Sequence, residues 1–349
     1  MKKLTARGKY ILPINRYIIN FRYAFRPRKP LLILRLFSTY LKILFLKAKP
    51  LRYIDFAIDY GCNMRCEHCF ATALEKKDKE AISPAQFGQI VKNAMKLGAL
   101  NFSFQGGEPT LFPKLFDYIK MAQPRNNLIS VTTNGSLLTE DMIDKLKKAY
   151  VDILTISLDS GIPKEHDDFR RSPGSFSKAL EGIKLALKNK MNVTIGTTVT
   201  HGSLYSEGFI KLIDMAHELN VIVFAALAAP LGRWEDNSKI LIRQEDREYI
   251  NSLSKKYPLF RTDFEANYVN YGCGAVKEIL YITPYGDVLA CPYLHFSLGN
   301  ILKESLRNIR ERALRNPYFK DYYKLCLAAE DRYFIKTYSI SSNKITGLL

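Results

Sequence analysis

The fold is decided by residues 54–69, which read IDFAIDYGCNMRCEHC. The first half is a short apolar run of the kind that forms a buried strand, and a glycine then ends it. The second half places Cys62, Cys66 and Cys69 within eight residues, separated by three and then two residues. A buried strand followed by a cysteine-rich loop predicts a parallel sheet that carries its reactive groups on the loops after its strands.

Further apolar runs alternate with amphipathic helical stretches along the chain, which is typical of parallel β-α-β units. We expect strands over residues 54–60, 101–105, 128–133, 153–158, 193–199 and 221–227. Six such units predict an α/β fold, a partial (β/α)6 version of the TIM-type barrel. The expected domains are a basic amphipathic N-terminal arm (1–52), the core barrel (53–235), a connecting helix (236–265) and a small C-terminal cluster-binding domain (266–349).

Unusual polar and glycine motifs fall at the C-terminal ends of these expected strands. Gly106-Gly107-Glu108-Pro109 follows the second strand, Thr132-Thr133-Asn134-Gly135 ends the third, and Ser157-Leu158-Asp159-Ser160 ends the fourth. Each motif alone is a weak signal, because a Gly-Gly or Asn-Gly pair is usually just a turn. Parallel strands bring their carboxyl ends to one rim, so the motifs together predict a single site around the cysteine loop.

The close cysteine triplet favours an iron-sulfur cluster. Three thiolates on one loop hold three corners of a cubane and leave the fourth iron open to a small molecule. Zinc is the alternative, but a structural zinc site wants four ligands, and His68 is poorly placed between two of the cysteines to be the fourth. An electron carrier or sensor is the non-enzyme alternative, and it would leave the glycine motif and Glu108 without a purpose.

The three remaining cysteines, Cys273, Cys291 and Cys326, are spread over the C-terminal third. A secreted disulfide framework is disfavoured, because the chain is large and has no signal sequence. The open alternatives are a second metal centre and three ordinary core cysteines. A second centre is favoured because no cysteine of the chain lies outside the two sets of three.

The basic character of the chain belongs to its N-terminal arm. The first 52 residues hold 14 of the 52 Lys and Arg and no acidic residue, which leaves 38 basic against 34 acidic residues for the rest. Such asymmetry indicates an anionic partner surface. No zinc finger, aromatic platform or helix-turn-helix pattern accompanies the charge, which disfavours nucleic acid.

Residues 31–46 of the arm are apolar apart from Arg35, Ser38, Thr39 and Lys42, whose spacing predicts a helix with one polar stripe. Two charges within sixteen residues argue against a membrane-spanning helix. Two alternatives stay open. Either residues 1–50 dock on an anionic membrane, with Arg22, Arg26, Arg28 and Lys29 facing the lipid, or the helix packs on the body.

Taken together, the cysteine loop, the Gly-Gly-Glu-Pro motif, Thr133-Asn134-Gly135 and Ser157-Leu158-Asp159-Ser160 resemble the radical S-adenosylmethionine (SAM) superfamily over about residues 53–235. The resemblance implies a [4Fe-4S] cluster on Cys62, Cys66 and Cys69, with SAM chelating the open iron. By the same resemblance, Gly106, Gly107 and Glu108 would bind the SAM amino group, and Ser157 and Asp159 would lie near the ribose. His68 would contact adenine, and Thr133 and Asn134 would line the pocket floor.

The stretch from Cys273 to Cys326 looks like the SPASM or twitch extension that carries auxiliary iron-sulfur clusters. A full SPASM domain uses seven cysteines for two clusters, so three cysteines fit the twitch type with one auxiliary cluster better. The fourth ligand is left open between an external molecule and a side chain such as His295, Glu330 or Asp331.

The expected activity is that of an oxidoreductase or transferase that cleaves SAM reductively to a 5′-deoxyadenosyl radical and takes hydrogen from an unreactive carbon. Such an enzyme needs a low-potential electron donor such as flavodoxin or ferredoxin. The basic apolar arm favours a membrane-associated lipid, polyprenyl or glycolipid substrate, and the alternative is a peptide- or protein-modifying maturase. The oxygen lability of the clusters implies a cytoplasmic protein, peripheral on the inner face of the membrane if the arm docks there.

Overall fold

The computed structural model describes residues 21, 25–76, 78–268 and 270–338. One ten-stranded sheet runs through the molecule in the order β10-β9-β8-β1-β2-β3-β4-β5-β6-β7. Strands β8 and β1 through β7 are parallel, whereas β9 and β10 are antiparallel additions. The strands are β1 Tyr53–Ala57, β2 Asn101–Gln105, β3 Leu128–Thr133, β4 Ile153–Ser157, β5 Asn192–Val199, β6 Ile222–Leu227, β7 Phe260–Thr262, β8 Ile279–Ile282, β9 Asp287–Leu289 and β10 Gly299–Asn300.

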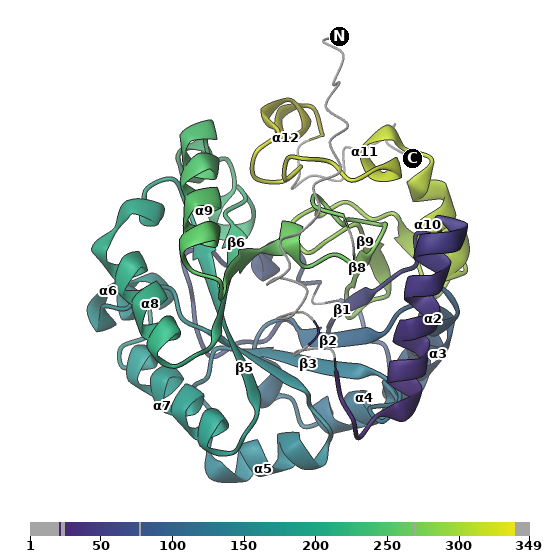
Figure 1. The fold of residues 1–349 in the computed structure, drawn as a ribbon, viewed down its shortest axis with the longest axis horizontal. Helices are drawn as coiled ribbons and strands as arrows, with labels where there is room; N and C mark the ends of the chain where they lie inside the picture. Colours follow the sequence, from purple (N-terminus) through teal and green to yellow (C-terminus); the bar gives the residue numbers. More distant parts are fainter. Residues whose placement is uncertain (1–20, 22–24, 77, 269, 339–349) are drawn as a thin grey trace.

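The predicted α/β partial barrel is confirmed. All six expected strands are present, and those over 101–105 and 128–133 have the expected bounds. The sheet curves inside a ring of helices (Figure 1), and in the described part of the chain β7 does not pair with β10, so the barrel stays open on one side. Four strands were not expected from the sequence: β7, which extends the sheet beyond β6, and β8 to β10, which extend it on the β1 edge.

Helices that follow strands β1 to β6 cover the outside of the sheet (Figure 1). Their starts follow from local capping: Ser83 and Gln86 form a capping box at the start of α3, and Thr139 and Ser206 cap α5 and α8. The helices are α2 Pro30–Leu46, α3 Pro84–Lys96, α4 Leu115–Met121, α5 Glu140–Lys148, α6 Pro163–Arg170, α7 Ser175–Lys188, α8 Glu207–Glu218, α9 Gln244–Lys256, α10 Leu306–Leu314, α11 Pro317–Lys320 and α12 Arg332–Tyr338. Short 3-10 turns are Ala71–Ala73, Pro109–Leu111, Ser203–Tyr205, Gly232–Trp234, Ser238–Ile240 and Asp263–Glu265.

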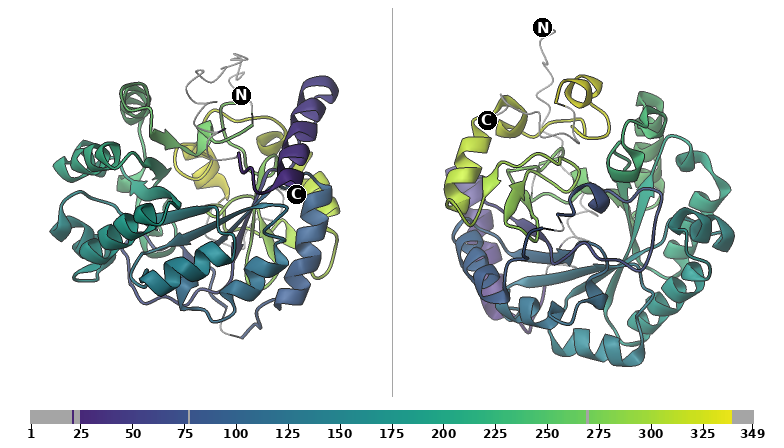
Figure 2. Two further views of the ribbon diagram at one scale, coloured as in Figure 1. Left: turned by 60° about the horizontal axis from the view of Figure 1, so that its bottom comes forward. Right: turned by 180° about the vertical axis from the view of Figure 1, so that it is seen from behind.

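The C-terminal region is joined to the barrel by its strands. Strand β8 pairs in parallel with β1, and β9 and β10 continue from it. The expected connecting segment holds the helix α9 and then β7, which belongs to the core sheet. Figure 2 shows α10 to α12 beside this extension, on the open side of the barrel. The core barrel and the cysteine-bearing C-terminal region therefore share one sheet and hold each other in place.

Helix α2 packs against the N-terminal ends of the strands. Its inner face places Leu32, Leu36, Tyr40 and Ile43 against Leu100, Leu128 and Tyr268. The predicted polar stripe faces the body in part, because Thr39 is buried and Arg35 donates to the backbone oxygen of Asn126 at 3.0 Å. The helix thus packs on the body, which was one of the two sequence-based alternatives. None of the described helices is long and apolar enough to cross a bilayer.

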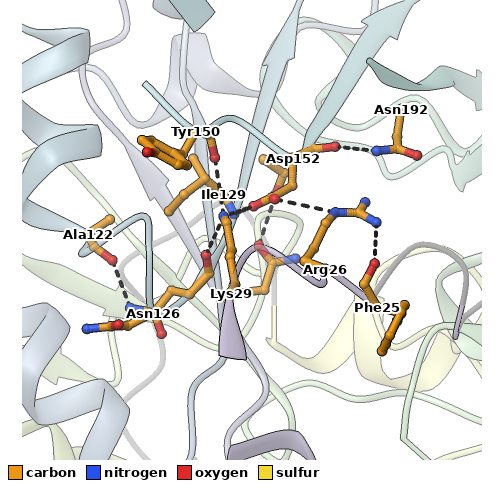
Figure 3. Close-up of polar contacts among 12 residues, drawn as sticks. Phe25, Arg26, Lys29, Ala122, Asn126, Ile129, Tyr150, Asp152 and Asn192 are labelled. Atoms are coloured by element: carbon orange, nitrogen blue, oxygen red, sulfur yellow. Dashed lines mark hydrogen bonds and ion pairs between the residues drawn. The ribbon is translucent and has the colours of Figure 1, made fainter. Parts of the chain in front are cut away.

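The start of α2 is fixed by a buried ion pair (Figure 3). The ammonium of Lys29 contacts the Asp152 carboxylate and donates to the backbone oxygen of Asn127 at 2.9 Å, and Arg26 lies 3.3 Å from the same carboxylate. Lys29 and Asp152 are 3 % and 6 % exposed, and burial lowers the pKa of Lys29 and raises that of Asp152. The expectation that Arg26 and Lys29 face lipid is therefore wrong, since Asp152 takes both charges. Arg28 is exposed, and Arg22 lies outside the described residues.

Candidate functional site

The cysteine loop leaves β1 at its C-terminal end and meets the loops that follow β2 and β3. The glycine motif makes this contact through its backbone, since Gly107 N–H donates to Asp59 O and Glu108 N–H donates to Gly61 O, both at 2.9 Å. A Cβ on Gly106 would lie 2.1 Å from Asp59 O, and one on Gly107 would lie 1.9 Å from Gly61 O. Only glycine fits at either position, so the motif fixes the start of the cysteine loop.

Glu108 is fully buried, and its carboxylate accepts four hydrogen bonds. The donors are the Thr110 N–H (3.1 Å) and hydroxyl (2.5 Å), the Thr133 hydroxyl (2.6 Å) and the Asn134 N–H (2.6 Å). Burial raises the pKa of Glu108, and these donors act against that rise. Direct contact with a ligand ammonium would need a change of conformation, because no part of the residue reaches the surface. In this arrangement Glu108 ties the β2 loop to the β3 loop.

Asn134 reaches the cysteine loop from β3. Its amide donates to the side-chain oxygen of Asn63 at 2.8 Å, and its nitrogen lies 4.0 Å from the Cys62 sulfur. Asn63 in turn donates to the Ser136 hydroxyl at 2.9 Å. The third predicted motif therefore lies beside the first cysteine, as the shared rim of parallel strands requires.

A charged residue that sequence reasoning missed stands beside the second cysteine. Arg170, at the end of α6, lies 2.6 Å from Asp159 and 3.7 Å from the Cys66 sulfur. Burial opposes ionisation of Asp159, but the Arg170 guanidinium outweighs it and holds the pKa of that carboxyl below its ordinary value. Asp159 also accepts from Thr198 N–H at 3.1 Å. Asp159, which the sequence predicts near a ribose, thus forms an ion pair with Arg170.

His68 stacks on Phe169, with ring centroids 4.7 Å apart, and lies 5.9 Å from Trp234. Burial lowers its pKa to about 4, so the imidazole is neutral at physiological pH. Its Nδ1 is buried without a hydrogen-bond partner in the described part of the chain. An aromatic wall with one unsatisfied nitrogen suits a heteroaromatic base, which is the role predicted for His68.

Arg233 holds the cysteine loop from the other side. Its guanidinium donates to Cys66 O at 3.1 Å, and its N–H donates to Cys69 O at 3.2 Å. Ser157 ends β4 and is half-buried, so the predicted residues after β1, β2, β3 and β4 all lie at one end of the sheet. Their individual ligand-binding roles stay predictions.

The second cysteine set is assembled from three separate segments. Cys273 precedes β8, and its backbone pairs with that of Tyr323 in an isolated antiparallel β-bridge. Cys291 follows β9, and Cys326 lies before α12. Burial raises the pKa of all three thiols, and the charges of the other two cysteines contribute further to the rise at Cys326. The β-bridge to Tyr323 brings the segment before Cys326 to Cys273, so residues far apart in sequence are neighbours in the fold.

Of the three side chains considered as a fourth ligand, two are already engaged. Glu330 accepts from Cys326 N–H and from Arg247, both at 2.7 Å, and Asp331 accepts from the Tyr323 hydroxyl at 2.7 Å. His295 pairs its Nε2 with Pro292 O, while its Nδ1 is buried and lacks a partner among the described residues. Of the three, His295 therefore has a ring nitrogen, Nδ1, that is available to bind a metal.

Among the described residues no three His, Cys, Asp or Glu side chains converge on a point where a single metal ion would bind. An iron-sulfur cubane asks for a different arrangement, because each thiolate binds its own iron at a separate corner. All six cysteines are free thiols. Two sets of three free thiolate donors fit clusters, since soft sulfur ligands select iron-sulfur centres over single hard cations.

Comparison with known proteins agrees with this geometry. The family profile described as "Radical SAM superfamily" matches residues 58–219, and the SPASM profile, described as "Iron-sulfur cluster-binding domain", matches residues 273–329. The chain belongs to the radical SAM superfamily. Within it, the chain is an enzyme with a C-terminal SPASM iron-sulfur domain, and it uses a [4Fe-4S] cluster, SAM and an auxiliary iron-sulfur cluster.

Its relatives act on different substrates. The chain is 24% identical to the AdoMet-dependent heme synthase of Methanosarcina barkeri, over 82% of this chain and 93% of that protein. It is 26% identical to the mycofactocin maturase MftC of Mycobacterium tuberculosis, over 72% and 68%. A solved structure of Streptococcus suis SuiB bound to precursor peptide SuiA superposes with a TM-score of 0.61 at 19% identity, over 78% of this chain and 67% of that one.

Proposed function

We propose that this chain is a radical SAM maturase that oxidises an unreactive carbon in a peptide or protein. We also propose that Cys62, Cys66 and Cys69 hold the SAM-binding cluster and that Cys273, Cys291 and Cys326 hold the auxiliary one. When bound, these groups supply a 5′-deoxyadenosyl radical that takes a hydrogen atom and a second centre that carries one electron. The protein's own residues hold the cysteines, exclude water and orient the ligands.

The observation that carries the proposal is the contact between the two cysteine regions. Phe70, directly after Cys69, lies 5.5 Å from the ring of Tyr293 and 5.9 Å from that of His295. Those two residues follow Cys291 by two and four positions. An aromatic contact between the two cysteine regions suits a reaction in which one substrate both loses a hydrogen atom and gives up an electron, which is an oxidation.

The choice of a peptide rests on the relatives and on the place of α2. MftC, named a maturase, and SuiB, solved with a precursor peptide, match 72% and 78% of this chain. The argument for a lipid substrate was the apolar arm. Yet α2 packs on residues at the N-terminal ends of β2 and β3, Leu100 and Leu128, whereas the cysteine loop follows the C-terminal end of β1. A lipid held by the arm would lie at the wrong end of the barrel.

A tetrapyrrole is the second candidate, favoured by one observation. The match to the heme synthase spans 93% of that protein, which is more than the 68% of MftC that is matched. The starting electron would come from a low-potential donor of the flavodoxin or ferredoxin type in either case.

The test uses anoxically reconstituted full-length protein with SAM and dithionite. Three fractions from cells grown in deuterated medium are added separately: a peptide digest, a tetrapyrrole extract and a lipid extract. We expect deuterium in 5′-deoxyadenosine only with the peptides. Deuterium from the tetrapyrroles or lipids instead would overturn the peptide assignment, and SAM cleavage that persists in Cys66→Ala would overturn the site itself.

A further inference from the structure

The apolar residues of α2 that face away from the body have no cover in the described structure. We define the outer face of α2 as Leu31, Leu34, Phe37, Leu41, Leu44 and Phe45. Their exposed fractions are 53%, 63%, 64%, 39%, 65% and 78%. Apart from the adjacent Leu44 and Phe45, they recur every three or four residues, so they form one stripe along the helix. A contiguous exposed apolar stripe of this length marks an interaction surface rather than chance exposure.

From the outer face of α2 we infer that this enzyme docks on an anionic phospholipid bilayer. The inner face of the helix is already used, since Leu32 and Thr39 are buried against the barrel. A helix fixed to a globular body by one face and apolar on the other lies in the membrane interface instead of crossing it. This inference is independent of the substrate proposed above, because it concerns the helix and not the cysteine rim.

The charge around the outer face of α2 favours an anionic bilayer as the surface that covers it. Arg28, Lys42 and Lys47 are exposed on α2 or directly at its ends. Apart from Arg26 and Lys29, which pair with Asp152, the sequence from residue 1 to 29 carries seven Lys and Arg and no acidic residue. Each basic residue near an anionic surface adds roughly 1 kcal/mol of attraction. A second copy of the chain would bring these like charges together, so a symmetric dimer through the outer face is disfavoured.

The contacts that fix the start of α2 to the barrel also set the orientation of the docked enzyme. Lys29 and Asp152 fix the start of α2 at the N-terminal end of β4, and Arg35 contacts the turn before β3. The helix cannot leave the body to enter the bilayer without exposing a buried ion pair. The bilayer therefore receives the helix and the barrel as one unit, with the cysteine loop at the far ends of the strands.

The test is flotation of the full-length protein with phosphatidylcholine vesicles, with and without phosphatidylglycerol. We expect binding to the anionic vesicles, weaker binding to phosphatidylcholine alone, and a decrease as salt is raised. The double variant Phe37→Ser/Phe45→Ser should reduce binding about tenfold or more. Both side chains are exposed, so the fold should be kept, and circular dichroism melting checks this.

Two matched controls make the result specific. Leu302→Ser/Tyr333→Ser changes exposed apolar residues elsewhere, at 55% and 68% exposure, and should bind as the parent does. Lys42→Glu/Lys47→Glu should weaken binding to anionic vesicles, whereas Lys178→Glu/Lys184→Glu on α7 should not. Absence of binding by the parent chain, or equal losses in the controls, would overturn the inference. So would a dimer in sedimentation that the Phe37→Ser/Phe45→Ser change dissociates.

SAM cleavage by the same variants separates this inference from the proposed function. SAM cleavage without added substrate should be unchanged in Phe37→Ser/Phe45→Ser, because α2 packs at the N-terminal ends of the strands and the cysteine loop lies at the C-terminal end of β1. If the variant no longer floats with the vesicles but still cleaves SAM, the change affects membrane binding alone. Loss of cleavage in the parent chain concerns the enzyme alone.

Discussion

We propose iron-sulfur clusters on both cysteine regions, and the two regions are built in opposite ways. Cys62, Cys66 and Cys69 lie on one loop, held by backbone contacts to a glycine turn and by Arg233. Cys273, Cys291 and Cys326 come from three segments whose spacing is set by β8, β9 and the Tyr323 bridge. The first set is local in sequence, so its geometry depends on one loop. The second depends on the packing of a whole domain.

The charges around the two sets differ as well. Arg170 stands 3.7 Å from Cys66, and the first set has two acids with buried side chains: Glu108, which accepts four hydrogen bonds, and Asp159, which is paired with Arg170. The second set has the buried Asp55 and the half-buried Asp263, whose charges help raise the pKa of Cys291. Its buried cations among the described residues are Lys277, whose charge lowers the pKa of Cys273, and Arg310, which donates to the backbone oxygens of Val276 and Lys277. An acidic surrounding disfavours further negative charge, so the two sets should differ in redox behaviour.

The largest expected effect is removal of a ligand from the local set. Cys66→Ala should lose SAM cleavage to background and about four iron atoms per chain, because a cubane with two protein thiolates is not retained. The second set should keep its iron. Iron analysis and 5′-deoxyadenosine assay of anoxic protein measure both. Loss of all iron would break the comparison by making the two sites interdependent.

Removal of a ligand from the dispersed set is the mirror experiment. Cys326→Ala should lose a similar amount of iron and all product formation but keep SAM cleavage within about threefold, because the cysteine loop is held by its own contacts. The paired measurement is cleavage with and without substrate. If Cys326→Ala abolished cleavage as Cys66→Ala should, the idea of a self-sufficient loop would be wrong.

A pH effect should mark the acidic surroundings of the second set. Burial raises the pKa of Asp55 from 3.8 to about 7, with a smaller contribution from Asp263. A carboxyl with a raised folded-state pKa costs stability as it ionises, so this cost is absent near pH 4 and grows as pH rises to about 7. Asp55→Asn should be more stable than the parent at pH 8, by up to roughly 3–4 kcal/mol, and similar at pH 4. Denaturant melts of the clusterless protein at both pH values measure this.

Equal stability of the Asp55→Asn variant and the parent at pH 8 would contradict the buried-acid picture. The matched control is Asp117→Asn on α4, which removes an exposed carboxyl.

The smallest expected effect is on reduction potential. A cation near a cluster favours its reduced, more negative form, so removing one lowers the potential by roughly tens of millivolts. Arg170→Met should shift the first cluster and Lys277→Met the second, and Arg170→Lys should restore most of the first shift. Redox titration followed by electron paramagnetic resonance separates the two signals. A shift of the wrong cluster would show that these cations do not act locally.

The sequence was sufficient for whatever depends on neighbours along the chain. Apolar alternation predicted β2 and β3 to the residue, and the cysteine spacing predicted an iron-sulfur protein. Arg170 could not be predicted, because it lies 104 residues from Cys66 and its own helix gives no sign of the contact. The short strands β7 and β9, of three residues each, carry too little pattern to be found.

The arm shows the same limit. Its periodicity predicted a helix over 31–46, and α2 spans Pro30–Leu46. The sequence could not decide which side would pack, because both faces are apolar. The choice came from Lys29, whose partner Asp152 lies 123 residues away.

That separation also sets an order of events during translation. The arm leaves the ribosome long before Asn127 and Asp152 have been synthesised, so for about a hundred residues neither side of α2 has its final neighbours. Helix α2, although it lies near the start of the described residues, is therefore among the last elements to reach its native place. A nascent chain of this enzyme thus exposes a basic, apolar segment to its surroundings well before the barrel on which α2 packs has been synthesised.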